Sequence, residues 1–175
     1  ASDFGVSSGW AQNRVTPDFV GLFPDPSGAP DTRALFHTDG QNLEIEDVGT
    51  FTDGYAVRKF TNKTLSGGSA PSGGSNEFVD TDFPMFRLAD ALLMYAEAVL
   101  RGGAGGSTDE ALTYVNMVRE RAYGNTSGNI TAGQLNLQFI LDERGRELYW
   151  ECHRRTDLIR FEHFTGADYL WSWKG

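Results

Sequence analysis

The stretch ELYWECHRRTDLIRF, residues 147–161, holds the side chains in this sequence that are best suited to chemistry. It contains carboxylates, three arginines, a histidine and the only cysteine of the chain. Such a set could serve an active site, a metal site or the polar interior of a scaffold. The spacing of its members decides among these three interpretations.

Three glutamates recur every four residues, at Glu143, Glu147 and Glu151, and therefore form one stripe on a helix. A carboxylate-bridged metal site in a helical bundle needs Glu-x-x-His on facing helices, whereas the nearest histidine follows Glu151 by two positions. We therefore expect no catalytic metal. The stripe instead predicts a buried or half-buried ion-pair network that fixes helix register. Its candidate partners are arginines on the same helix or the preceding one: Arg144, Arg146, Arg154, Arg155, Arg119 and Arg121.

Cys152 beside His153 resembles a nucleophile with its base, but neighbouring residues on a helix point about 100° apart and cannot share a proton directly. A buried structural thiol is the better interpretation. The sequence has no Gly-x-Ser-x-Gly elbow, phosphate-binding loop or dinucleotide fingerprint, so we expect no catalytic residues and no cofactor. The acidic loops are compatible with a structural calcium site, although no EF-hand-like spacing occurs.

The elements that position these residues are helical after residue 80. Apolar periodicity predicts a largely buried helix over 83–101, and a second over 108–124 with Thr108 as its N-cap and Gly124 at its end. These two form an αα-hairpin of tetratricopeptide size. A third helix is predicted from about Asn136 to Phe161, and Gly145 inside it suggests close backbone packing at that position.

Residues 1–80 are rich in turns instead. A short helix is expected to begin at Pro17, and Asp53-Gly54 between apolar runs predicts the turn of a small β-hairpin. We therefore expect a mainly α protein, with a loop-rich segment over 1–80 and a helical region over 81–175.

The composition narrows the possible partners. The net charge of −9 and the pI near 4.7 make nucleic acid an unlikely partner, because a phosphate backbone would be repelled. No apolar run approaches the roughly 20 residues of a membrane span. The chain lacks an initiator Met and a signal peptide, and it ends within an aromatic run, so we expect a fragment of a longer protein.

Saccharide binding is the chemistry that the loops favour. Flat aromatic rings stack on the C–H faces of sugars, and planar amides or guanidiniums bind the hydroxyls. Trp10, Asn13 and Arg14 offer this combination just before the first short helix, and Tyr55 beside the predicted turn is a weaker aromatic candidate. The competing interpretation of Trp10 is a core residue.

Two long runs carry a family resemblance. They are RLADALLMYAEA, within residues 87–98, and ERGRELYWECHRRTDLIRF, residues 143–161. Together with ALTYVNMVRERA and FTGADYLWSWKG they resemble the C-terminal half of the SusD/RagB family, and GWAQNRVTPDFVGLF is similar to an earlier segment of it. The resemblance implies a helical scaffold with tetratricopeptide-like hairpins, in which residues 147–161 are structural.

The resemblance also implies a function. Members are surface lipoproteins of Bacteroidetes that bind glycans without turnover and pass them to a SusC-like TonB-dependent outer-membrane transporter. Full members are much longer, and we expect the lipid anchor, which alone would attach the protein to the membrane, to lie outside this chain. The leading interpretation is glycan capture at the outer membrane, with Trp10, Asn13, Arg14 and Tyr55 as ligand-binding residues. A protein-binding helical scaffold without a sugar site is the alternative, and a glycoside-processing enzyme is the third.

Overall fold

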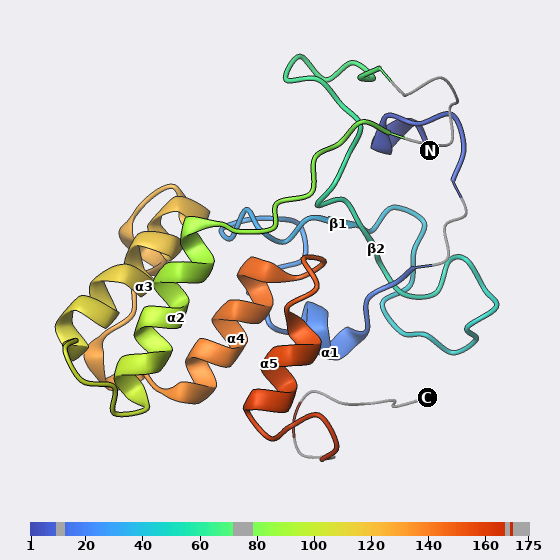
Figure 1. The fold of residues 1–175 in the computed structure, drawn as a ribbon. Helices are drawn as coiled ribbons and strands as arrows, with labels where there is room; N and C mark the ends of the chain where they lie inside the picture. Colours follow the sequence, from blue (N-terminus) through green and yellow to red (C-terminus); the bar gives the residue numbers. More distant parts are fainter. Residues whose placement is uncertain (10–12, 72–78, 167–168, 170–175) are drawn as a thin grey trace. The chain divides into compact units, whose positions relative to one another are not determined.

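The computed structural model of the chain describes residues 1–9, 13–71, 79–166 and 169 (Figure 1). The fold is mainly α, as predicted, with one short two-stranded sheet in this part of the chain. The chain forms two compact units. The loop unit comprises residues 1–17 and 35–83, and the helical unit comprises residues 18–34 and 84–175. The segment 18–34 thus packs with the helices, whereas the sequence placed it in the loop-rich part.

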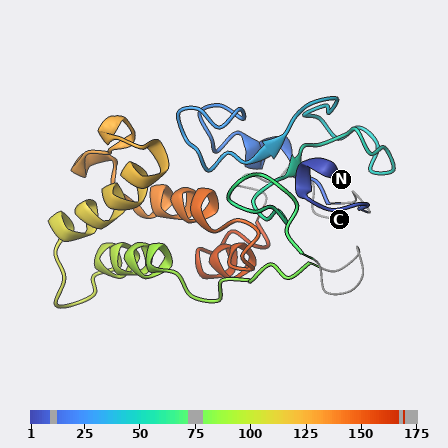
Figure 2. The same ribbon diagram turned by 90° about the horizontal axis from the view of Figure 1, so that it is seen from above.

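The helical unit is built on α2 (Leu88–Leu100), α3 (Thr108–Tyr123), α4 (Leu137–Leu148) and α5 (Arg154–Arg160). Helix α2 packs against both α3 and α4, and α4 packs against α5 (Figure 2). Two 3₁₀ turns, η2 (Thr126–Gly128) and η3 (Ala132–Gln134), connect α3 to α4. The core of this unit is apolar and buried; it contains Leu93, Ala96, Ala111, Val115, Ile130, Leu135 and Ile140. The predicted αα-hairpin is therefore present as α2 and α3.

Local capping sets the helix ends. Ser107, one residue before the predicted cap, accepts a hydrogen bond from the Glu110 amide, and Gly124 ends α3 in the left-handed conformation with φ 69°. Asn136 caps α4 by accepting from the Phe139 amide at 2.9 Å. Helix α2 differs from expectation because it is only partly buried: Leu88 is 71% exposed and Met94 is 49% exposed.

The predicted third helix is wrong in one respect, because it is broken into α4 and α5. Trp150 and Cys152 have positive φ angles of 59° and 64°, which no α-helix contains. The Glu147 carbonyl accepts a hydrogen bond from Arg87 at 3.0 Å, while the Glu151 amide turns to Leu148 O at 3.1 Å. A guanidinium thus replaces the next helical amide, and the helix ends.

The loop unit holds η1 (Ser2–Phe4) and the antiparallel pair of β1 (Phe36–His37) with β2 (Ala56–Val57). Helix α1 (Pro17–Val20) begins at the last residue of the first segment of this unit and continues in the helical unit. Phe36 pairs with Val57 and His37 with Ala56. The predicted small β-hairpin is present, but its turn is not at Asp53-Gly54, because the two strands are joined by residues 38–55. The reason lies in Asp53, whose side chain is buried and binds the loop before it.

Candidate functional site

The predicted binding residues that the structure describes lie in the loop unit. Trp10 lies outside the described residues. Asn13 is exposed, while Arg14 and Tyr55 are partly buried. Val15 and Tyr55 form an antiparallel bridge in which the Val15 amide donates to Tyr55 O at 3.0 Å. The structure therefore brings the segments of Arg14 and Tyr55 together, as a common site requires.

The Arg14 guanidinium is used mainly to hold backbone. It donates from Nη1 to Asn13 O at 3.1 Å and from Nη2 to Phe51 O at 2.6 Å. Its Nε is shielded from solvent and has no hydrogen-bond partner. Burial lowers the pKa of Arg14 from its ordinary value. Arg14 is therefore an anchor of the neighbouring loop, and only part of its donor capacity is left for a ligand.

Phe51 is a residue that sequence reasoning missed. Its ring is 62% exposed, and its carbonyl accepts from Arg14 and, at 3.4 Å, from Gln41 Nε2. Its position just before Asp53-Gly54 is typical of a strand entering a hairpin turn, where alternate aromatic residues face a core. The alternation of Thr50, Phe51 and Thr52 also favours a half-buried strand, so the sequence gives no signal of this exposure.

Asp53 fixes the loop that carries Phe51. Its carboxylate accepts from the amides of Glu46 and Asp47, each at 3.1 Å, and from Asn42 Nδ2 at 3.1 Å. The hydrogen bond from the Asp47 amide, with those from Asn42 and Glu46, lowers the pKa of Asp53 against the opposing effect of burial. The carboxylate is thus ionised at neutral pH and holds residues 42–53 in one conformation.

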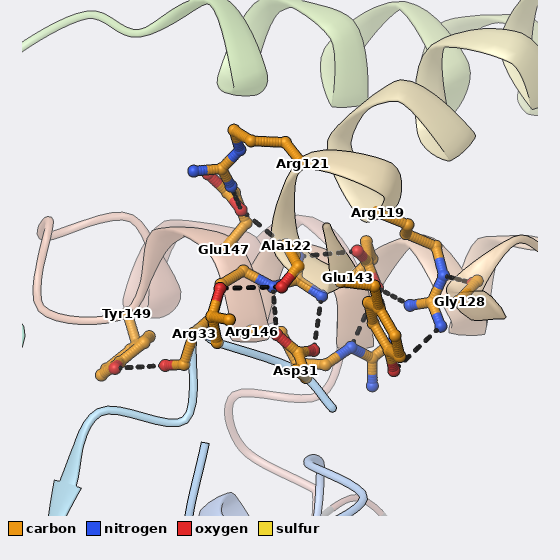
Figure 3. Close-up of polar contacts among 12 residues, drawn as sticks. Asp31, Arg33, Arg119, Arg121, Ala122, Gly128, Glu143, Arg146, Glu147 and Tyr149 are labelled. Atoms are coloured by element: carbon orange, nitrogen blue, oxygen red, sulfur yellow. Dashed lines mark hydrogen bonds and ion pairs between the residues drawn. The ribbon is translucent and has the colours of Figure 1, made fainter. Parts of the chain in front are cut away.

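The carboxylate stripe of residues 143–151 forms the predicted ion-pair network in the helical unit (Figure 3). Glu143 is fully buried and contacts Arg33 at 2.8 Å, Arg119 at 2.7 Å and Arg146 at 2.8 Å. Burial would raise its pKa, but the charges of Arg33, Arg146 and Arg119 prevail and lower the pKa to about 2. Three cations around one buried carboxylate keep it charged, which makes it a structural group.

Arg33 and Arg87 are the two partners that the sequence did not predict. Arg33 pairs with Asp31 at 2.7 Å and reaches both Glu143 and Glu147, which confirms that these glutamates share one face of α4. Arg87, just before α2, bridges Glu147 at 2.8 Å and Glu151 at 2.7 Å. The stripe therefore joins α4 to two segments distant in sequence.

Other arginines depart from their predicted partners. Arg144 pairs with Asp90 at 2.7 Å and Asp157 at 2.9 Å instead of with the stripe. Arg154 donates to Leu141 O at 2.8 Å, and a Cβ on Gly145 would meet its Nη1 at 3.1 Å. Gly145 is thus closely packed, but its nearest neighbours are the side chains of Arg154 and Leu22, whereas the prediction was of close backbone packing.

A cleft of about 520 Å³ lies between α2 and α5. Its carboxylates are Asp90, Glu97 and Asp157, and each is held by an arginine. Burial would raise the pKa of Glu97, but hydrogen bonds and charges from Arg160 and Arg101 lower it. The general acid of a glycoside hydrolase must have a raised pKa, whereas the pKa of Glu97 is lowered.

Cys152 is exposed, so the prediction of a buried thiol is wrong. The break after α4 turns it outward. Within residues 1–9, 13–71, 79–166 and 169, no cluster of three or more His, Cys, Asp or Glu side chains could hold a metal ion. None of the helices described there is long and apolar enough to span a membrane.

Comparison with known proteins identifies the family of this chain. The sequence model of the SusD family matches residues 39–173, most of the chain. The chain belongs to the SusD family. It is 37% identical over 151 residues to the starch-binding protein SusD of Bacteroides thetaiotaomicron, covering 84% of this chain and 25% of that protein. It is also 45% identical over 82 residues to the SusD-like protein P25 of Formosa agariphila, covering 44% of this chain and 15% of that protein.

Membership of the SusD family covers both units, because the matched region begins in the loop unit at residue 39 and extends through α5. The chain spans about a quarter or less of the length of these relatives. The resemblance that the runs at 87–98 and 143–161 suggested is therefore confirmed, and both runs lie in the ion-paired helical scaffold.

Proposed function

We propose that the protein binds oligosaccharide or polysaccharide at the bacterial outer-membrane surface without chemical turnover. The observation that carries this proposal is the 37% identity to a starch-binding protein over 84% of the chain. The loop unit adds the appropriate chemistry, since Arg14 and Tyr55 lie on bridged segments and Asn13 is exposed beside them. Trp10 belongs to the same proposed site by its sequence position.

Binding without turnover is the part of the proposal that the helical unit supports. Its buried carboxylates are locked to arginines, and the pKa values of Glu143 and Glu97 are lowered. General acid catalysis needs a carboxyl group that keeps its proton near neutral pH. These groups serve the fold, so a glycoside-processing role has no support from them.

The proposal includes delivery as well as capture. A SusC-like TonB-dependent transporter would receive the bound glycan, and a lipid anchor would hold the protein at the cell surface. Family membership supports these assignments. Co-purification of the transporter with the lipidated protein would test them, and a protein that never associates with such a transporter would contradict delivery.

Calorimetric titration of soluble glycans into the chain tests binding directly. The Trp10→Ala variant should lose most of its affinity for any glycan that binds the parent. Trp150→Ala is the matched control, because Trp150 is a partly exposed tryptophan in the helical unit. Circular dichroism would verify that all three proteins are folded. Failure of every glycan to bind the folded parent would remove the sugar site from this chain.

A protein-binding scaffold remains the second candidate, because α2 leaves an apolar stripe exposed. Leu88, Ala91, Met94 and Ala98 follow one another at helical spacing, and all are solvent-exposed. Met94 and Ala98 also line the cleft beside α5. If this surface binds a protein partner, Met94→Glu should abolish that association and leave glycan titrations unchanged. An unchanged association would exclude the α2 stripe as the contact.

A further inference from the structure

The loop over residues 39–53 is the most acidic exposed segment of the loop unit. It contains five carboxylates, Asp39, Glu44, Glu46, Asp47 and Asp53, and no lysine, arginine or histidine. All of them except Asp53 are exposed. The only cation that the described contacts bring to this loop is Arg14, whose guanidinium is engaged with backbone carbonyls. The loop therefore presents a negative surface.

The same loop is held rigidly by its own polar groups. Asp53 binds the amides of Glu46 and Asp47, and Asp47 Oδ1 accepts from the Gly49 amide at 2.8 Å. Two further turns are closed by backbone hydrogen bonds: the Thr50 amide donates to Asp47 O at 3.0 Å, and the Asp53 amide donates to Thr50 O at 3.1 Å. A side chain on such a backbone keeps its position, which reduces the entropy lost when it binds a ligand.

Phe51 is the aromatic residue that this backbone presents. Single exposed apolar side chains are common and carry no argument alone. Phe51 differs because Arg14 and Gln41 both donate to its carbonyl, and each has a second polar atom without a partner. Arg14 Nε is a donor and Gln41 Oε1 is an acceptor, and both are shielded from solvent.

This arrangement matches a sugar ring and its hydroxyl groups. An exposed phenyl ring offers a flat face to the C–H groups of a pyranose, and it has no polar atom that would favour another ligand. Phe51 is also adjacent to the Arg14 guanidinium, which donates to its carbonyl, and the N–H groups of a guanidinium can bind sugar hydroxyls.

The charge of the loop restricts the class of sugar. Carboxylates within about 10 Å act on one another at ordinary ionic strength, so a uronate or sulfate group would be repelled at this surface. A neutral saccharide has no such penalty. Nearby carboxylates do not repel the hydroxyl groups of such a sugar, because these groups can donate hydrogen bonds to them.

We propose that Phe51 is a stacking contact for neutral saccharides, and that the acidic 39–53 loop disfavours anionic glycans. The proposal rests on the proposed function and specifies its ligand class. It adds a residue that the family resemblance did not supply, together with a physical reason for selectivity.

Titration of the full chain with maltoheptaose and other neutral oligosaccharides, beside polygalacturonate, tests both parts. Phe51→Ala should weaken binding of the neutral ligand by roughly tenfold, since one aromatic contact is lost. Phe51→Tyr keeps the ring and should retain the parent affinity. Val48→Ala is the matched control, because Val48 lies in the same loop and is 90% exposed; it should stay within about twofold of the parent.

Charge reversal tests the selectivity. Glu44→Lys with Glu46→Lys should improve binding of polygalacturonate relative to maltoheptaose, and the gain should shrink at high salt because screening weakens it. If the ratio of the affinities for polygalacturonate and maltoheptaose is the same before and after the change, the proposed selectivity is overturned. Neutral ligands that bind the parent and Phe51→Ala equally would overturn the Phe51 contact alone. A folded parent that binds no glycan would overturn the proposed function and this inference together.

Discussion

Arg33 in the helical unit and Arg14 in the loop unit show how differently one side chain is used in the two parts of this protein. Arg33 is buried, and its guanidinium pairs with three carboxylates, Asp31, Glu143 and Glu147. Arg14 is partly buried, pairs with two backbone carbonyls and leaves Nε unsatisfied. The saturated Arg33 joins segments of the helical scaffold, whereas Arg14 holds a loop and keeps one N–H group without a hydrogen-bond partner.

The carboxylates follow the same division. Glu143 and Glu147 lie within a shell of arginines, and their charge is neutralised inside the protein. Glu44 and Glu46 are exposed on the 39–53 loop, which has no basic residue. Clusters of chemically capable residues therefore mark the scaffold in this protein, and the sparser loop is the better candidate for recognition.

Removal of the central carboxylate should give the largest effect. Glu143→Gln leaves Arg33, Arg119 and Arg146 short of a buried anion, so the free energy of unfolding should fall by about 3–5 kcal/mol. Denaturant unfolding would measure it. Glu162→Gln is the control in the same unit, since Glu162 is exposed. A loss below about 1 kcal/mol would show that the network is dispensable.

Acid should destabilise the helical unit through the same group. Because the pKa of Glu143 is lowered from 4.5 to about 2 in the folded protein, its contribution is complete above pH 4.5 and is lost as the pH falls toward 2. The loss should reach about 3 kcal/mol, measured as the pH dependence of unfolding free energy. The Glu143→Gln variant should lack this part of the acid slope; an identical slope would assign it elsewhere.

Substitution of Gly54 tests how tightly the loop unit is packed around Arg14. Its φ is +75°, and a Cβ there would lie 2.9 Å from Arg14 Cβ and from Ile45. Gly54→Ala should therefore destabilise the loop unit by about 1–3 kcal/mol and weaken glycan binding. Gly40→Ala is the matched control, because Gly40 has φ +67° but open space around it. Equal effects of both changes would attribute the cost to backbone strain alone.

The smallest loss of unfolding free energy should follow from removing an exposed ion pair of the helical unit. Arg101 is 40% exposed and pairs with Glu97 one turn away at 2.8 Å. Arg101→Ala should lower the free energy of unfolding by only about 0.5 kcal/mol, because water screens such pairs. Thermal unfolding beside Glu143→Gln would measure the contrast. Comparable losses would contradict the division between buried and exposed pairs.

Sequence reasoning succeeded where the determinants are local. The end of α3 at Gly124 and the start of α4 after Asn136 follow from capping within a few residues. The stripe of Glu143 and Glu147 follows from helical periodicity. These features depend on neighbours in the sequence, so the pattern alone predicts them.

Distant determinants were not predictable. Arg33 and Arg87 could be matched to the stripe only after the chain had folded, since they precede Glu147 by 114 and 60 residues. The break at Trp150 was invisible because neither Gly nor Pro marks it. Phe51 was missed for a related reason: its exposure depends on Asp53 binding the loop, and Asp53-Gly54 alone is typical of a hairpin turn.

The pairing of Arg33 with Glu143 has a consequence for the order in which the protein folds. It closes a loop of 110 residues, whereas α2 and α3 meet across a short connection. Loop closure over such a span is slow compared with formation of a local hairpin. Residues 18–34 should therefore dock after the helices have assembled. Arg33→Gln should accordingly accelerate unfolding more than it slows refolding, which stopped-flow kinetics would reveal.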